Sequence, residues 1–108
     1  GYAFSDEETL AAIQEVHQQH GYTIDPHGAV GYLAAKAYLK NHPEKQVVIL
    51  GTAHPAKFLP TVEKAIGEKI SIPERLARLE KLEKKAVAMP AEFSAFKSYL
   101  LSNISGTK

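Results

Sequence analysis

The sequence predicts an α/β fold that is mostly helical, with about five helices, one clear buried parallel strand at residues 46–51 and a short extended segment at residues 22–24. Start signals followed by apolar residues at helical spacing predict the helices, and an uninterrupted, largely β-branched run predicts the strand. A chain of 108 residues, 44% of them hydrophobic, can bury one modest core, so we expect a single domain over residues 1–108.

The first helix should begin at Ser5-Asp6-Glu7-Glu8, which matches a capping box, and end at Gly21, where a left-handed cap belongs. Its stripe at helical spacing is Leu10, Ile13, Val16, His17 and His20. The two histidines have the i, i+3 spacing of metal ligands, but they continue the apolar stripe and have no third ligand nearby in the sequence. We therefore predict no metal site.

A second helix should begin at Asp25-Pro26, because the carboxylate can cap free amides and proline fits the first helical turn. It should run to about Asn41, ahead of Pro43. Glycine inside a helix costs up to about 1 kcal/mol, so Gly28 and Gly31 in the first two turns suggest close approach of another backbone or of a ligand.

The strand at residues 46–51 is expected to be covered on both faces, as in the interior of a parallel sheet. Its parallel neighbour would be residues 22–24, joined to it through the second helix by a right-handed crossover. Since the chain offers no further strand, at least one sheet edge should lack a partner, and we expect self-association through that edge.

Three more helices are expected, one from Pro55 to Gly67, one from Pro73 and one after Pro90. The apolar residues of the last two are Leu76, Leu79 and Leu82, and Phe93, Phe96, Leu100 and Ile104. Residues 74–85 are dense in charges of both signs, which is typical of a solvated helix face.

Composition excludes several classes of function. Thirteen Lys and Arg against twelve Asp and Glu give a net charge of +1, so we predict neither nucleic acid nor a membrane surface as a partner. The absence of cysteine excludes thiolate chemistry and fits a reducing cytoplasm, and no apolar run is long enough for a membrane span. Because the chain begins without Met, we interpret it as a piece of a longer protein.

Polar residues gather where two predicted helices follow two predicted strands. Asp25 and His27 open the second helix, and Thr52 and His54 precede the third. Ligands of open α/β sheets bind beyond the carboxyl ends of strands, beside helix starts, so these four residues would converge on one rim.

Each of these residues also has a purely local interpretation. Asp25 can be a simple helix cap, and the two histidines can be turn residues bound to local carbonyls. Thr52 can be a strand-end hydroxyl that satisfies a neighbouring amide. Lys57 projects from a first helical turn and can be solvated or lie beside a ligand.

Two segments resemble the threonine synthase family. Tyr22-Thr23-Ile24-Asp25-Pro26-His27-Gly28-Ala29-Val30-Gly31 is similar to a signature in the carboxyl-terminal part of these enzymes. So is Val48-Ile49-Leu50-Gly51-Thr52-Ala53-His54-Pro55-Ala56-Lys57-Phe58, in which the signature at residues 52–58 is intact. The chain departs at Gly28, where the family usually has Thr, and at Gly51, where Ser is common; the first departure removes a hydroxyl but leaves a backbone role.

The resemblance implies that residues 1–108 are the carboxyl-terminal segment of a larger three-layer pyridoxal 5'-phosphate enzyme. That enzyme would convert O-phospho-L-homoserine and water to L-threonine and phosphate. The resemblance places the Schiff-base lysine upstream of this chain, so Lys57 would not be that lysine and the segment alone would be inactive. It makes Thr52 a hydrogen-bond partner of the cofactor's pyridine nitrogen and Asp25, His27 and His54 candidate pocket residues.

Two alternatives remain open at the level of the sequence. The chain could be a stand-alone α/β module that binds a phosphate or carboxylate at its helix starts without catalysis. A purely structural helical interaction domain fits the helices but leaves both polar signatures unexplained. The predicted strand distinguishes a segment of a larger enzyme from a stand-alone module, because an autonomous module should not leave residues 47–50 without sheet partners.

Overall fold

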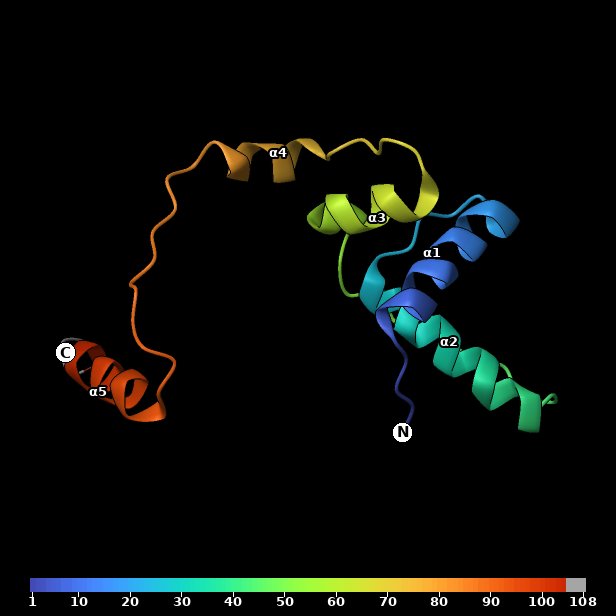
Figure 1. Ribbon diagram of the computed structural model, residues 1–108, viewed down its shortest axis with the longest axis horizontal. Helices are drawn as coiled ribbons and strands as arrows, with labels where there is room; N and C mark the ends of the chain where they lie inside the picture. The colour runs from blue at the N-terminus through green and yellow to red at the C-terminus, as the bar shows by residue number, and fades with distance from the viewer. Residues whose placement is uncertain (105–108) are drawn as a thin grey trace.

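All regular structure in residues 1–104, the part described by the computed structural model, is helical. The elements are α1 (Asp6–His20), α2 (Pro26–Asn41), the short 3₁₀ helix η1 (Pro55–Phe58), α3 (Leu59–Ile66), α4 (Glu74–Glu80) and α5 (Phe93–Ile104). Figure 1 shows α1, α2 and α3 packed together at one end of the molecule, while α4 and α5 extend away from them.

Local signals place the ends of α1 as the sequence predicts. The Ser5 amide donates to the Glu8 carboxylate at 2.7 Å, and the Glu8 amide donates to the Ser5 hydroxyl at 3.2 Å, which completes the capping box. Gly21 ends the helix in the left-handed conformation with φ of 62°. Gly67, with φ of 74°, ends α3 in the same way.

The core lies where α1 meets α2 and α3. Its fully buried members are Ala12, Ile13, Ala29 and Val62, with Ile24, Leu33 and Phe58 packed against them. Burial of such side chains contributes roughly 1.5–3 kcal/mol each for the larger ones. In this small cluster, apolar side chains of α1, α2 and α3 are buried against one another.

One ion pair with a neighbouring hydroxyl fastens α1 to α2. Lys36 Nζ donates to the Glu15 carboxylate at 2.6 and 2.9 Å, and the Tyr32 hydroxyl donates to it at 2.9 Å. Hydrogen bonds from Lys36 and then Tyr32 hold the pKa of Glu15 below its ordinary value. The Glu15 carboxylate therefore favours its charged form in the folded protein.

The predicted α/β fold is wrong for the described residues, which contain helices and no strand. Residues 46–51 are an extended stretch, and no neighbouring strand among residues 1–104 takes up their backbone hydrogen bonds. Residues 22–24 are likewise irregular and do not pair with them. The sheet edge on which the predicted self-association rested is therefore absent from residues 1–104.

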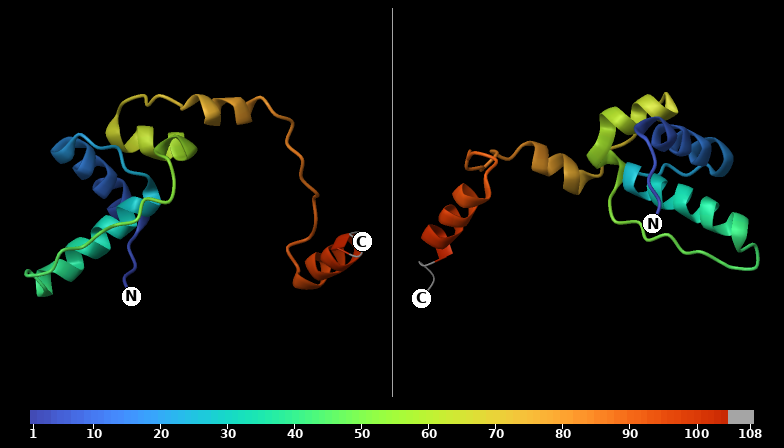
Figure 2. Two further views of the ribbon diagram at one scale, coloured as in Figure 1. Left: turned by 180° about the vertical axis from the view of Figure 1, so that it is seen from behind. Right: turned by 60° about the horizontal axis from the view of Figure 1, so that its bottom comes forward.

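The extended stretch also fails the expectation of burial on both faces. Val48 and Leu50 are 84% and 80% exposed, whereas Val47 and Ile49 are 40% and 38% exposed. The stretch returns beside α2, as Figure 2 shows, and Val47 and Ile49 are partly covered there while Val48 and Leu50 stay exposed. At Gly31 an added Cβ would lie 2.9 Å from the Ile49 side chain, so the close neighbour of this glycine is a side chain and not the backbone or ligand that the sequence suggested.

The second half of the chain is open. The radius of gyration is 19.2 Å, against about 13 Å for a compact chain of this length. Residues 81–94 are all exposed, and Leu82 lies beyond the end of α4 rather than within it. No helix among residues 1–104 combines the length and the apolarity needed to cross a membrane.

Candidate functional site

The two signature segments meet at a cleft of about 290 Å³, here called the Asp25 cleft. It is lined by Asp25 and Gly28 from the first signature and by Gly51 and Ala53, which flank Thr52, from the second. Tyr32 and Ile49 complete the wall between them. The fold thus brings the two predicted motifs together without a sheet, through the return of the extended stretch along α2.

The four predicted residues do not converge on one rim. His27 opens instead onto a second cleft of about 690 Å³, the His27 cleft, which it shares with Phe58 and Lys64. His54 lines a third hollow with Lys57 and residues of α4. The expected single rim is not found, because no sheet aligns the two helix starts, and Asp25, His27 and His54 line three different hollows.

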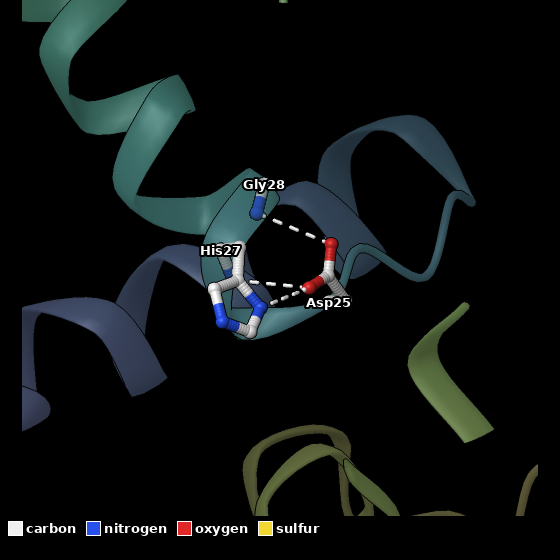
Figure 3. A network of polar contacts seen from close by, with 3 residues as sticks. All are labelled: Asp25, His27 and Gly28. Carbon is white, nitrogen blue, oxygen red and sulfur yellow. Dashed lines mark hydrogen bonds and ion pairs between the residues drawn. The ribbon is translucent and has the colours of Figure 1, made fainter. Parts of the chain in front are cut away.

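Asp25 is both a helix cap and the partner of a histidine. Its carboxylate is 3% exposed, and Figure 3 shows its contacts. Oδ1 accepts the Gly28 amide at 3.2 Å, while Oδ2 accepts the His27 amide at 3.1 Å and lies 2.8 Å from His27 Nδ1. The predicted cap is confirmed, and the Gly28 amide is one of the two amides that it binds.

The contact with Asp25 fixes how His27 presents its ring. A carboxylate can only accept, so Nδ1 carries the hydrogen and Nε2 is left with its lone pair in the neutral imidazole. The side chain is 63% exposed, and its ring centroid lies 5.0 Å from that of Phe58. In its neutral form His27 therefore carries a hydrogen-bond acceptor at Nε2, and the residue lines the His27 cleft.

His54 has the opposite arrangement. The Ala56 amide donates to His54 Nδ1 at 3.1 Å, which caps η1. Nδ1 must be unprotonated to accept this bond, so the ring hydrogen sits on Nε2. His54 therefore offers a donor where His27 offers an acceptor.

Thr52 lies in the extended stretch between Gly51 and Ala53 and is exposed. Its hydroxyl makes no hydrogen bond with any of residues 1–104, so the interpretation of Thr52 as a locally satisfied strand-end residue has no support there. A hydroxyl in this state can still donate to, or accept from, a bound group.

Two residues with a place in these clefts escaped the sequence analysis. Phe58 closes the second signature but was not a candidate pocket residue, yet its ring contacts His27. Tyr32 lines the Asp25 cleft while its hydroxyl holds Glu15. An aromatic residue inside a polar signature was the available signal for Phe58, whereas nothing local distinguishes Tyr32.

Comparison with known proteins places the chain in one class. Residues 28–100 match the family model described as threonine synthase, C-terminal. The chain belongs to this family, which confirms the resemblance noted in the sequence.

Individual relatives agree with that assignment. The chain is 37% identical over 103 residues to threonine synthase of Escherichia coli strain K12, covering 95% of this chain and 24% of the relative. It is 38% identical over 99 residues to threonine synthase of Pseudomonas aeruginosa, covering 91% of this chain and 21% of the relative. It thus spans about a quarter or less of the length of these curated relatives.

A solved structure agrees as well. The crystal structure of threonine synthase from Escherichia coli superimposes with a TM-score of 0.78 at 38% sequence identity. The match covers 94% of this chain and 23% of that one. The arrangement of helices described above is thus similar to one part of that enzyme.

Proposed function

We propose that residues 1–108 are the carboxyl-terminal segment of a threonine synthase, an enzyme that converts O-phospho-L-homoserine and water to L-threonine and phosphate. The observation that carries the proposal is that 94–95% of the chain matches enzymes of this name in both sequence and structure. A cytoplasmic location accords with amino-acid biosynthesis.

The remainder of the enzyme chain is the proposed main partner of this segment. The chain spans only about a quarter of its relatives, and its apolar side chains are extensively exposed. Val48 and Leu50 on the extended stretch and Phe93 on α5 are 79–84% exposed. An autonomous binding module should not leave such residues uncovered, so these exposures favour the segment over the stand-alone phosphate or carboxylate module.

The proposed cofactor is pyridoxal 5'-phosphate, which when bound supplies an electron sink for elimination and addition at the substrate carbons. Thr52 is the residue proposed to hold its pyridine nitrogen. The donor chemistry fits, because the Thr52 hydroxyl is exposed and makes no hydrogen bond with residues 1–104. A neutral hydroxyl leaves the nitrogen largely unprotonated, in contrast to a carboxylate.

Asp25, His27 and His54 are proposed to shape the pocket. Asp25 is buried and acts through His27, which it orients, so it is a positioning residue in this proposal. His27 lines the His27 cleft and His54 lines the hollow beside α4, so each of them would contact a bound group separately.

The Schiff-base lysine is proposed to lie outside this chain, so the segment alone would be inactive. Lys57 sits on η1 and is exposed. The test is to incubate the purified chain with pyridoxal phosphate, reduce with borohydride and record the absorption spectrum and intact mass. We expect no stable adduct, and stoichiometric labelling of Lys57 would refute the placement.

The role of Thr52 is tested in the complete enzyme. Thr52→Val should weaken cofactor function while leaving the fold intact, because valine has nearly the same shape and lacks the hydroxyl. Absorption of the bound cofactor and turnover measure the effect, and circular dichroism checks the fold. Ser71→Ala, which removes an exposed hydroxyl that lines none of the three hollows, is the control. Wild-type turnover and an unchanged cofactor spectrum in Thr52→Val would remove Thr52 from the site.

A further inference from the structure

The extended stretch at residues 46–51 lies beside α2 without a hydrogen bond to hold it (Figure 2). Within residues 1–104, none of residues 46–53 donates or accepts a hydrogen bond, through either backbone or side chain. A strand is located by its ladder, but this stretch has none. The contacts of its side chains with α2 therefore decide where the stretch lies.

Ile49 lies between two hollows of the surface. On one side it lines the Asp25 cleft, and on the other it lines a fourth hollow whose wall includes Gly31 of α2. Ile49 is partly covered, whereas its neighbours Val48 and Leu50 are exposed. Ile49 is thus the point at which the stretch meets the thin side of α2.

Gly31 allows Ile49 to come this close. A Cβ added at Gly31 would lie 2.9 Å from Ile49 Cγ2, a separation that real Cβ atoms essentially never show. This methyl group sits on a branched Cβ that is stiff at χ1, so it cannot swing aside as the end of a flexible side chain can. A side chain at position 31 would therefore push Ile49, and the backbone that carries it, away from α2. We call this approach of Ile49 to Gly31 the α2 contact.

Thr52 lies between two fixed points of the chain. The α2 contact fixes Ile49 on one side, and on the other His54 caps η1 by accepting the Ala56 amide at 3.1 Å. Gly51 has open space around it, and Thr52 itself is exposed and makes no hydrogen bond with residues 1–104. The place of the Thr52 hydroxyl is therefore set by these two points and not by contacts of its own.

We propose that Gly31 and Ile49 are positioning residues for Thr52. The α2 contact sets how far the extended stretch stands from α2, and thereby where the Thr52 hydroxyl lies. This placing depends only on contacts within the chain, whereas its consequence for catalysis rests on the proposed function, in which Thr52 holds the cofactor. Gly31 and Ile49 act through Thr52, so a displacement at Gly31 should reach the cofactor only by moving that hydroxyl.

The first test is the NMR spectrum of the isotopically labelled chain. The wild type should show a nuclear Overhauser effect between the Cγ2 methyl group of Ile49 and the α protons of Gly31. Gly31→Ala should shift the amide and methyl signals of Thr52. Alanine favours a helix more than glycine does, so this variant should keep α2 and its fold, which circular dichroism checks.

A second substitution should reverse the effect of the first. Ile49→Ala in the Gly31→Ala background removes the methyl group that the new Cβ meets, and it should return the Thr52 signals toward their wild-type positions. If Gly31 and Ile49 served only the general stability of the fold, the two substitutions would add instead of compensating each other. Val48→Ala is the matched control, because it trims a β-branched side chain of the same stretch that is 84% exposed. It should leave both the Overhauser effect and the Thr52 signals as in the wild type.

The complete enzyme shows what the placing of Thr52 does for the reaction. Gly31→Ala should lower kcat by about 10-fold to 100-fold, as expected when a group is misplaced by up to about 1 Å. KM should change less, and the absorption of the bound cofactor should change as it does in Thr52→Val. Adding Ile49→Ala should recover part of the lost kcat.

Three results would overturn the proposal. The Overhauser effect could be absent from the wild type, the Thr52 signals could stay unchanged in Gly31→Ala, or the double variant could be no closer to the wild type than Gly31→Ala. A different pattern separates this proposal from the proposed function. If the Thr52 signals respond as expected while Thr52→Val leaves the cofactor spectrum and turnover unchanged, the placing of Thr52 is confirmed and only its role toward the cofactor is refuted.

Discussion

The Nδ1 atom of His27 lies 2.8 Å from Oδ2 of Asp25, and the same carboxylate accepts the amides of His27 and Gly28. One buried side chain therefore both caps α2 and orients an imidazole that faces a cleft. The cap requires only an acceptor oxygen, whereas the orientation of the ring requires an acceptor that is held in place beside Nδ1. Substitution can separate the two roles.

Asp25→Ala should remove both roles and Asp25→Asn only one. Loss of the cap in the alanine variant should lower the free energy of unfolding by about 1–2 kcal/mol, while asparagine, itself a good cap, should cost less. Urea unfolding measures the difference. Imidazole ¹⁵N shifts should show the Nδ1–H tautomer of His27 in the wild type and a shift toward Nε2–H in the alanine variant. An unchanged tautomer in Asp25→Ala would contradict the positioning role.

Truncation of a side chain should cost stability in the cluster of α1, α2 and α3 but not in the extended stretch at residues 46–51. Ile13 is fully buried, so Ile13→Ala should lower the free energy of unfolding by about 2–4 kcal/mol. Leu50 is 80% exposed, so Leu50→Ala should change it by less than about 0.5 kcal/mol. Thermal and urea unfolding of this chain provide both values. If Leu50→Ala were as costly as Ile13→Ala, the extended stretch would have to be buried.

Acid should weaken the contact between α1 and α2. The pKa of Glu15 is lowered from 4.5 by its hydrogen bonds to Lys36 and Tyr32, so the unfolded state binds a proton more readily than the folded state. The stabilisation from Glu15 is therefore present above about pH 4.5 and is lost as the pH falls through the lowered value. Stability measured against pH should fall less steeply there in Glu15→Gln. The matched control Glu83→Gln should leave the curve as it is.

Limited proteolysis should cut the chain first between α4 and α5. Residues 81–92 are exposed and carry no helix, and Lys81, Lys84 and Lys85 provide trypsin sites. Lys36 lies within α2 and is held by Glu15, so cleavage there should be slow. Mass spectrometry of early digests identifies the cuts. Cleavage after Lys36 at the same early times would show that the helical cluster is not the stable part of the chain.

Helix ends could be predicted from the sequence because their causes are local. The hydroxyl of Ser5, the carboxylate of Asp25 and the backbone freedom of Gly21 act within one turn, so their effect is visible in a few adjacent letters. The strand at residues 46–51 could not be judged in this way. Its β-branched run is compatible with a strand, but a strand exists only where a second segment takes up its hydrogen bonds, and residues 1–104 provide none.

In the candidate site, too, the features with local causes could be predicted and those that depend on tertiary contacts could not. The caps at Asp25 and His54 follow from their positions before Pro26 and Pro55. The pairing of Asp25 with His27, the approach of Phe58 to that ring and the opposite tautomers of His27 and His54 depend on distances that no spacing rule contains. The predicted common rim failed because it assumed a sheet to align the two helix starts.

The separation of α5 from the helical cluster has a kinetic consequence. This helix has 12 residues and none of them is buried, while isolated helices shorter than about 12–15 residues are marginal in water. We therefore expect α5 in the separate chain to exchange between helix and coil, with a relaxation time of about 0.1–1 μs. Ordering α5 costs conformational entropy, and contacts with a covering surface must offset that cost. The order of α5 therefore reports whether such a surface is present.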